Sequence, residues 1–273
     1  MMIKFKFSRR CVIIKKAKRI ALKILIALAV LVLVVCAAYF AVHYYQVKQM
    51  ENFAQEMSNP TSSSTSQNEQ STDVEVPVDF AKLKKVNPDI YAWIRIPGLD
   101  VVDYPVLQSK NNNAYYLKRT VNREWSVYGS IFTEDYNKKD FSDFNTLVYG
   151  HNMKNGTMFG SLKKFRDESF FEKNRYIYIY TENRILKYEI FAACTWDNKH
   201  ILASRNFKLE QNRTLYLQDI FAVRDMNSQV KKDIEVTADD KIITLSTCMN
   251  DKSKRFIVSG VLIYDSQNPQ ENN

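Results

Sequence analysis

Between positions 24 and 42 the chain runs for 19 residues without a charged side chain. As an α-helix this run would extend for about 28 Å, at about 1.5 Å per residue, which matches the hydrocarbon core of a bilayer. The run therefore predicts a transmembrane anchor over 24–42. A cleaved signal peptide is the alternative, but the run is longer than a usual signal core and no small-x-small cleavage site follows Val42.

The positive charge of the chain is concentrated around this run. The formal net charge is +9, from 39 Lys and Arg against 30 Asp and Glu. Residues 1–50 hold ten Lys or Arg and no Asp or Glu, so the remainder has 29 basic and 30 acidic residues, a formal charge of −1. This distribution argues against a nucleic-acid-binding protein. The positive-inside rule instead predicts that 1–23 is cytoplasmic and that everything after the anchor is extracellular.

A polar stretch separates the predicted anchor from the rest of the chain. Residues 43–77 are predicted to form an extracellular linker, because 59–67 is rich in Ser and Thr and holds no large apolar residue. The first part, 44–57, can alternatively extend the membrane helix outward. Residues 78–273 are sufficient to bury one substantial core and are predicted to form a single folded domain.

Strand periodicity dominates this domain. Helical spacing is confined to 78–86, 158–165 and 209–223. The predicted strands are 91–96, 101–107, 129–133, 146–149, 175–180, 185–195, 241–247 and 256–264. Many short strands with few helices predict a mainly β domain that forms a closed or nearly closed barrel, since such a barrel leaves no long exposed edge.

Cys248 is the strongest candidate for covalent chemistry. It follows an apolar strand and precedes a charged turn, and Arg255 opens the next apolar strand seven residues later. A hairpin would bring the guanidinium beside the sulfur. Because the thiolate is the nucleophile and a neighbouring cation favours it, a Cys and an Arg at adjacent strand ends form a usable pair.

The other cysteine of the predicted exported part is Cys194, which lies within an apolar strand. This setting is typical of an inert core thiol. A disulfide between Cys194 and Cys248 is the alternative for both residues, and the sequence does not decide between a bridge and two free thiols.

Three histidines occur, and each can be weighed separately. His43 belongs to the membrane boundary. His151 stands where a predicted strand gives way to a loop, which is a place where catalytic groups are often displayed. His200 lies in a polar connection and is interpreted as a solvated surface residue.

Motifs for metal ions and nucleotides are missing from the sequence. It contains neither His-x-x-x-His nor Cys-x-x-Cys, its acidic residues are scattered, and it has only six glycines. We therefore expect no metal site and no cofactor.

Taken together, these residues resemble the signature of sortases, and class B fits best. The resemblance is carried by Thr244-Leu245-Ser246-Thr247-Cys248, by Arg255, and by Tyr149-Gly150-His151-Asn152-Met153. It extends from about 78 to 264, and the stretch 199–231 is similar to the insertion typical of class B enzymes.

The resemblance implies an eight-stranded sortase β-barrel over 78–273 that acts on a C-terminal sorting motif of secreted proteins. It implies that Cys248 attacks a threonine carbonyl to form a thioester, with His151 as general acid and base and Arg255 as oxyanion or substrate ligand. Ser246 and Thr247 would line the substrate groove, although strand alternation lets at most one of them face the thiol.

The resemblance also implies an acceptor and a location. The acceptor would be an amine of the peptidoglycan precursor, or alternatively a pilin lysine. The enzyme would sit in the cell membrane of a Gram-positive bacterium, with its catalytic domain outside.

Two other interpretations remain open at this point. Another cysteine acyl enzyme, such as a wall peptidase or an L,D-transpeptidase, would share the nucleophile and the compartment. Those families predict a His-Gly-Cys cluster or a cysteine that precedes its histidine, whereas here His151 precedes Cys248. A membrane-tethered binding domain with a tyrosine-rich face is the non-enzymatic alternative.

Overall fold

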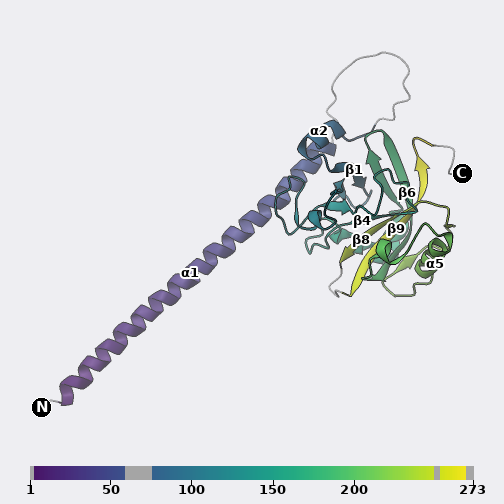
Figure 1. Ribbon diagram of the computed structural model, residues 1–273. Helices are drawn as coiled ribbons and strands as arrows, with labels where there is room; N and C mark the ends of the chain where they lie inside the picture. Colours follow the sequence, from purple (N-terminus) through teal and green to yellow (C-terminus); the bar gives the residue numbers. More distant parts are fainter. Residues whose placement is uncertain (1–2, 59–75, 249–252, 269–273) are drawn as a thin grey trace. The chain divides into compact units, whose positions relative to one another are not determined.

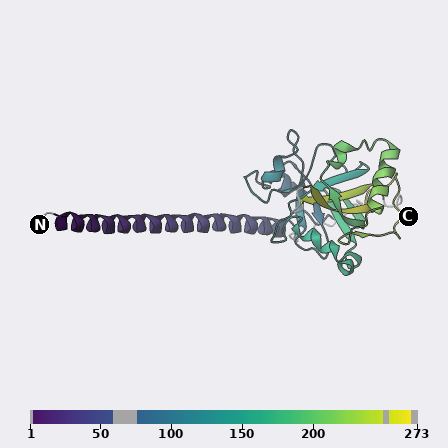
Figure 2. The ribbon, with the colours of Figure 1, turned by 90° about the horizontal axis from the view of Figure 1, so that it is seen from below.

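The computed structural model describes residues 3–58, 76–248 and 253–268 (Figures 1 and 2). The chain divides into two compact units, Met1–Phe53 and Ala54–Asn273. The polar segment 59–67, which the sequence predicts to be the centre of a linker, lies outside the described residues.

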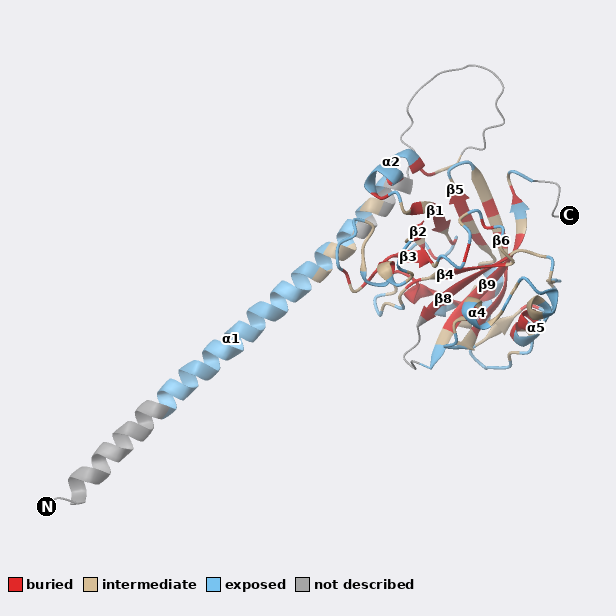
Figure 3. Ribbon diagram, in the orientation of Figure 1, coloured by how far each residue is buried: buried red, intermediate tan, exposed pale blue. Residues whose placement is uncertain are grey.

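The first unit is built on one long helix, α1 (Ile3–Ser58). Within this helix, Lys18–Gln49 is long and apolar enough to cross a membrane, with a mean hydropathy of 3.1, and its side chains are unburied (Figure 3). The predicted span 24–42 lies inside that segment. Residues 43–58, which belong to the predicted linker, are helical, in agreement with the alternative that 44–57 extends the membrane helix. No Gly or Pro interrupts them, and the helix ends before Asn59, whose helical conformation is disfavoured by the following proline.

The described residues of the second unit form a closed barrel of eight strands. Hydrogen-bonded neighbours follow the order β5-β1-β2-β3-β4-β8-β9-β6, and a further pairing of β5 with β6 closes the ring. The barrel strands are β1 (Ile90–Arg95), β2 (Asp103–Leu107), β3 (Ile131–Thr133), β4 (Asn145–Tyr149), β5 (Tyr176–Thr181), β6 (Arg184–Asp197), β8 (Ile242–Cys248) and β9 (Lys254–Asp265). A two-residue strand, β7 (Gln229–Val230), pairs with β6 outside the ring. The predicted mainly β, eight-stranded barrel is confirmed.

Two of the strand pairs are parallel, β2 with β3 and β4 with β8. In the second pair the register runs from Asn145 opposite Ile242 to Tyr149 opposite Ser246. Parallel strands end on the same side of a sheet, so the carboxyl ends of β4 and β8 meet at one rim of the barrel.

Six short helices complete the described part of the second unit. They are α2 (Phe80–Val86), η1 (Tyr115–Lys118), η2 (Gly160–Arg166), α3 (Glu168–Lys173), α4 (Ile201–Ser204) and α5 (Glu210–Phe221). Asp79 caps α2 by accepting a 2.9 Å hydrogen bond from the Lys82 N–H. The predicted helix 158–165 is a 3₁₀ helix that begins only at Gly160, because Met158 has a left-handed φ of 54°, which a right-handed helix cannot include.

The segment between β6 and β8 packs on the outside of the barrel. It carries α4, α5 and β7, and the buried α5 side chains Tyr216, Leu217 and Ile220 meet Leu147 of β4 and Ile242 of β8. Figure 3 shows this inner face of α5 as buried and its opposite face as exposed. The outer face of β4 and β8 is therefore covered by the insertion over one part of its length.

An ion pair at the far end of β9 supports the barrel. Arg184 of β6 donates to both carboxylate oxygens of Asp265, at 2.7 and 2.5 Å, and Asp265 is 2% exposed. Burial is the largest single influence on Asp265 and opposes its ionisation, but the hydrogen bonds and charge of Arg184, together with hydrogen bonds from Gln267 and Asn268, hold the pKa of this carboxyl below its ordinary value.

Asp265→Ala is expected to lower the free energy of unfolding by about 3 to 5 kcal/mol, because it leaves the partly buried Arg184 guanidinium without a carboxylate and with only the Asp140 carbonyl as acceptor among the described residues. The folded-state pKa of Asp265 is depressed. The contribution of its ionised carboxylate to the free energy of unfolding is therefore present above the unfolded-state pKa near 3.8, and it is lost as the pH falls below that value towards the folded-state pKa. Urea denaturation at pH 7 and pH 3 measures both effects. Asp219→Ala, which removes a half-exposed partner of Arg205, should cost less than about 1 kcal/mol.

Candidate active site

The β8–β9 hairpin brings Cys248 and Arg255 together. The register between these antiparallel strands runs from Ile242 opposite Val261 to Cys248 opposite Arg255, which are its last paired residues. Arg255 also pairs with Trp196 of β6 on its other side. The hairpin spacing predicted from the sequence is therefore correct for the backbone.

His151 lies at the same rim, beside β8. Tyr149 pairs with Ser246, and the Gly150 N–H donates to the Ser246 carbonyl at 3.2 Å, so the two chains continue side by side beyond β4. His151 is two residues past Tyr149, and Cys248 is two residues past Ser246. Because alternate residues share a face, these two positions are equivalent on neighbouring parallel segments.

The loop that carries His151 is tightly held. The His151 carbonyl accepts a 3.0 Å hydrogen bond from the Phe159 N–H, and an isolated bridge joins Asn152 to Met158. The ring nitrogen Nε2 lies 2.6 Å from the carbonyl oxygen of Leu117. A carbonyl only accepts, so Nε2 carries the hydrogen and Nδ1 is the nitrogen that remains for proton transfer. No side-chain pattern in the sequence indicates the contribution of Leu117, because it acts through its backbone.

The Arg255 guanidinium keeps most of its hydrogen-bonding capacity. The side chain is half-buried, and its Nη1 donates to the Lys254 carbonyl at 3.2 Å. Within residues 3–58, 76–248 and 253–268, no carboxylate forms an ion pair with it. Among the described residues, Arg255 is therefore a cation at the rim whose donors are not taken up by a carboxylate.

Ser246 and Thr247 lie on opposite faces of β8, and both are buried. Ser246 shares its face with the position of Cys248 and pairs with Ile257, whereas Thr247 pairs with Phe256. The Thr247 hydroxyl has no hydrogen-bond partner among the described residues. Of the two predicted groove residues, only Ser246 is on the face of the candidate nucleophile.

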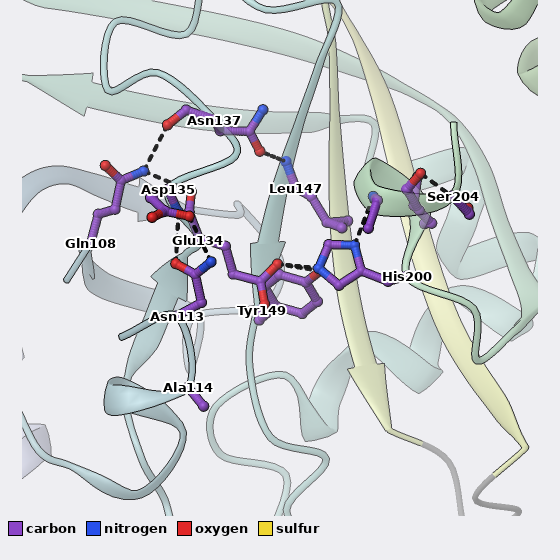
Figure 4. A network of polar contacts seen from close by, with 12 residues as sticks. Gln108, Asn113, Ala114, Glu134, Asp135, Asn137, Leu147, Tyr149, His200 and Ser204 are labelled. Atoms are coloured by element: carbon purple, nitrogen blue, oxygen red, sulfur yellow. Dashed lines mark hydrogen bonds and ion pairs between the residues drawn. The ribbon is translucent and has the colours of Figure 1, made fainter. Parts of the chain in front are cut away.

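A polar cluster adjoins this face, and we call Glu134, Tyr149 and His200 the Glu134 cluster (Figure 4). The Tyr149 hydroxyl donates to the Glu134 carboxylate at 3.1 Å, and His200 Nε2 contacts the same oxygen. Burial and then the Glu134 charge raise the pKa of Tyr149, while the charge of Arg255 opposes that rise. The prediction that His200 is a solvated surface residue is wrong: its ring is two-thirds buried because it caps α4 and binds Glu134.

Comparison with known proteins identifies the fold and the chemistry. A family model described as a sortase domain matches residues 94–263. Sortase B of Listeria monocytogenes is 33% identical over 192 residues, which is 69% of this chain and 76% of that protein. The chain belongs to the sortase family.

Solved sortases agree with this assignment. Sortase B from B. anthracis superposes with a TM-score of 0.64 at 36% identity, covering 80% of this chain and 96% of that one. Clostridium perfringens sortase B gives a TM-score of 0.60 at 35% identity, covering 68% of this chain and 100% of that one. The chain is therefore a cysteine transpeptidase of the sortase B type.

Cys194 of this sortase has the properties of a core thiol. It is a free cysteine, it is fully buried in β6, and burial raises its pKa to about 12. It pairs with Ile257 of β9, which in turn pairs with Ser246 of β8. Two strand spacings of about 4.8 Å separate β6 from β8, so the backbones are too far apart for a disulfide to Cys248.

A metal site is not found in the part of this sortase that the structure describes, where no group of three or more His, Cys, Asp or Glu side chains converges.

Gly160→Ala is expected to slow the sortase reaction by about tenfold or more and to destabilise the fold by about 1 to 3 kcal/mol. A Cβ at this position would lie 2.2 Å from the Met153 carbonyl oxygen and would displace the loop that holds His151. Peptide cleavage and thermal unfolding test both effects. Gly156→Ala, where a Cβ meets no atom within 4 Å, should cost only about 1 kcal/mol for its φ of 85° and leave the rate unchanged.

Proposed function

We propose that this sortase is an extracellular, single-pass membrane enzyme that joins secreted proteins to the cell wall through Cys248. It cleaves a C-terminal sorting motif and transfers the protein to an amine of the peptidoglycan precursor. One observation supports the proposal: Cys248 is paired with Arg255 on one side, and on the other side His151 follows two residues after the last parallel pair, Tyr149 with Ser246.

The first half-reaction forms a thioester. The Cys248 thiolate attacks the carbonyl carbon of a threonine in the sorting motif, giving a tetrahedral intermediate with a negatively charged oxygen. When the intermediate collapses, the peptide C–N bond breaks and the leaving amine takes a proton from His151. A C–S bond has then replaced a C–N bond, and the C-terminal fragment departs.

The second half-reaction reverses these roles. An acceptor amine loses a proton to His151 and attacks the thioester carbonyl, so that a new amide bond forms and the C–S bond breaks. The thiolate of Cys248 is regenerated. Atoms and charge balance without a redox step, which is consistent with an enzyme that needs no cofactor.

Arg255 and Ser246 complete the proposed site. Arg255 stabilises the oxyanion or the carbonyl from which it develops, because its donors are not used by a carboxylate among the described residues. Ser246 lines the substrate groove beside Cys248. Thr247 supports the strand from its other face, because successive residues of β8 alternate between the two faces. On that face it pairs with Phe256.

The proposed topology rests on the apolar segment and its charged flank. Lys18–Gln49 has the length and hydropathy of a membrane span. Residues 1–23 carry nine Lys or Arg and no acidic residue, so we infer that they stay in the cytoplasm and that the catalytic domain is outside, in a Gram-positive bacterium.

A relative supports the substrate class. Staphylococcus aureus sortase B, 31% identical to this chain with a TM-score of 0.58, has been solved as a substrate complex. For the present chain we infer a peptide segment as acyl donor and a primary amine as acceptor, with the pilin lysine as the alternative amine.

A peptide-transfer assay tests the proposal. The full chain in detergent micelles is mixed with fluorescent peptides that share a threonine at the cleavage site and differ in the residues before it. Short peptides with the amine of a peptidoglycan cross-bridge, or with the single lysine of a pilin segment, serve as acceptors. We expect cleavage of one motif class, an acyl-enzyme adduct detected by mass spectrometry, and a ligated product with the cross-bridge amine. Preference for the pilin lysine would reassign the acceptor, and cleavage of no threonine peptide would refute the proposal.

A further inference from the structure

A basic surface with exposed apolar side chains is formed by α2 and by the turn around residues 117–125. We call residues 80–86 and 117–125 the α2–turn face. These two segments hold six Lys or Arg and one acidic residue, whereas residues 51–273 as a whole have a formal charge of −1. Trp125 is 59% exposed, Val86 41% and Leu117 37%. Exposed apolar groups among cations mark an interaction site rather than a surface that meets only water.

The turn that displays Trp125 has a defined geometry. An isolated bridge pairs Arg119 with Trp125, and the Thr120 N–H donates to the Glu124 carbonyl at 2.8 Å. Between them Arg123 has a left-handed φ of 65°, which is uncommon and strained for a residue other than glycine. The surrounding contacts therefore hold this turn in one conformation.

Asn87, the residue that caps the carboxyl end of α2, joins the turn to the helix. Its Nδ2 donates to the Val121 carbonyl at 2.8 Å, and its Oδ1 accepts from Arg123 Nη2 at 3.0 Å. Arg123 also forms an ion pair with Asp89 at 3.7 Å. Because Asn87 is fully buried between the two segments that it bonds, α2 and the turn form one continuous surface.

Half of the cations on this face are neutralised by carboxylates of the same domain. The ion pairs are Lys82 with Asp79, Lys84 with Glu182 and Arg123 with Asp89. For Lys85, Lys118 and Arg119, the described part of the chain supplies no carboxylate partner. These three outnumber Glu124, so the face keeps a positive charge beside Trp125.

The chemistry of the α2–turn face fits the surface of an anionic phospholipid bilayer. An amphipathic indole lies at the level of the headgroups, and Lys and Arg are attracted to anionic lipids. The chain also carries its own apolar segment, Lys18–Gln49, and residues 50–79 join this segment to α2 by at most about 100 Å of chain. Because the proposed anchor keeps the domain near lipid, a weak attraction for headgroups is sufficient to dock it.

We propose that the α2–turn face docks on anionic phospholipid headgroups, with the Trp125 indole at their level and the free cations among their phosphates. The Leu117 carbonyl, which lies 2.6 Å from His151 Nε2, belongs to the same face, so docking brings the reaction rim to the lipid surface. This inference rests on the membrane anchor of the proposed function and is independent of the proposed reaction.

Fluorescence of Trp125 can report this contact because the chain has only three tryptophans. Trp93 is fully buried, and Trp196 is half-buried against Tyr216. The difference in emission between the wild type and Trp125→Phe therefore gives the contribution of Trp125. Bromine quenches an indole only on contact, so lipids brominated near the headgroup end of the acyl chain detect an indole at that depth.

The full chain is placed in nanodiscs of phosphatidylcholine, alone or mixed with phosphatidylglycerol, each prepared with and without brominated lipid. We expect the emission of Trp125 to be lost on brominated discs that contain phosphatidylglycerol and to be retained on brominated discs of phosphatidylcholine alone. The emission should return in about 1 M salt, where the Debye length falls to about 3 Å. Thermal unfolding establishes that each variant is folded.

Charge reversal tests the cations of the face. The double substitution Lys85→Glu with Lys118→Glu should abolish the quenching of Trp125 on anionic discs, while cleavage of the threonine peptide in detergent micelles stays at the wild-type rate. The matched control, Lys208→Glu with Lys232→Glu, makes the same change in charge at exposed positions of the insertion and should be quenched as the wild type is. Figure 1 shows α5 of this insertion well apart from α2.

Equal emission of Trp125 on brominated and plain anionic discs would overturn the docking. Quenching that survives the reversal of Lys85 and Lys118, or that the control pair removes to the same extent, would overturn it as well. Should Trp125→Phe fail to fold, the total emission of the two charge-reversed chains carries the test. A chain that does not enter the discs would overturn the proposed anchor, and this inference with it. A chain that is quenched as expected but cleaves no threonine peptide would refute the proposed reaction and leave the docking in place.

Discussion

Cys248→Ala is expected to abolish both thioester formation and transfer, leaving no cleavage above background. The reason is chemical: alanine has no nucleophile, and the reaction proceeds through an acyl group bonded to sulfur. Incubation with the preferred peptide followed by intact-mass spectrometry should show the acyl adduct on the wild-type chain only. The variant should unfold at the temperature of the wild type, since the change removes one sulfur atom at the end of β8.

Cys194→Ala is the matched control for this experiment. Its thiol is buried in β6 and its pKa is raised, so it is unsuited to attack a peptide. The variant should keep near-normal turnover. Persistent cleavage by Cys248→Ala, or loss of cleavage in a folded Cys194→Ala chain, would show that the nucleophile has been misassigned.

Arg255→Ala is expected to lower kcat on the order of a hundredfold or more, because removal of a single oxyanion donor costs about 2.7 to 4 kcal/mol in a well-studied protease. Arg255 is paired with Cys248 at the end of the hairpin, so in the proposed mechanism its charge acts on the carbonyl that Cys248 attacks. Since the interaction forms in the transition state, kcat and kcat/KM should fall together. Single-turnover kinetics with the preferred peptide measures this directly.

Two controls sharpen the test of Arg255. Arg255→Lys keeps the charge but not the planar fork of donors, so it should recover only part of the rate. Arg224→Ala removes an exposed arginine whose hydrogen bonds within the described part of the chain go to the Phe221 and Val223 carbonyls, and it should behave as wild type. Near-normal turnover of Arg255→Ala would leave the guanidinium without a role in the reaction.

Local sequence patterns predict the barrel because its strands are short, alternating and bounded by turns. All eight predicted strand segments begin and end within two residues of the observed strands. The hairpin partner of Cys248 is also predictable, since Cys248 and Arg255 are close in sequence and only one turn intervenes. The predicted helix 158–165 starts too early because of a single left-handed residue, Met158, whose φ is set by tertiary contacts.

Local sequence patterns do not predict contacts between residues that are far apart in the chain. The support of His151 comes from the Leu117 carbonyl, and every residue has a carbonyl, so nothing distinguishes this one in advance. His200 lies in a polar stretch, which indicates a solvated residue, yet it contacts Glu134, which directly follows β3, and Tyr149 of β4. In the sequence, only the family resemblance links His151 to Cys248. The parallel pairing of β4 with β8 joins segments that are far apart in the chain, and local sequence patterns do not indicate such a pairing.

The parallel pairing of β4 with β8 also bears on when the enzyme becomes active. Residues that pair over such a sequence separation come together late, since loop closure must precede the contacts that reward it. The segments that carry His151 and Cys248 are brought together by the pairing of β4 with β8, and β5, β6 and the insertion lie between these two strands in the sequence. During refolding, transpeptidase activity should therefore appear no earlier than hydrogen-exchange protection of the last barrel amides. A partly folded chain then has the Cys248 thiol but not yet the proposed catalytic site.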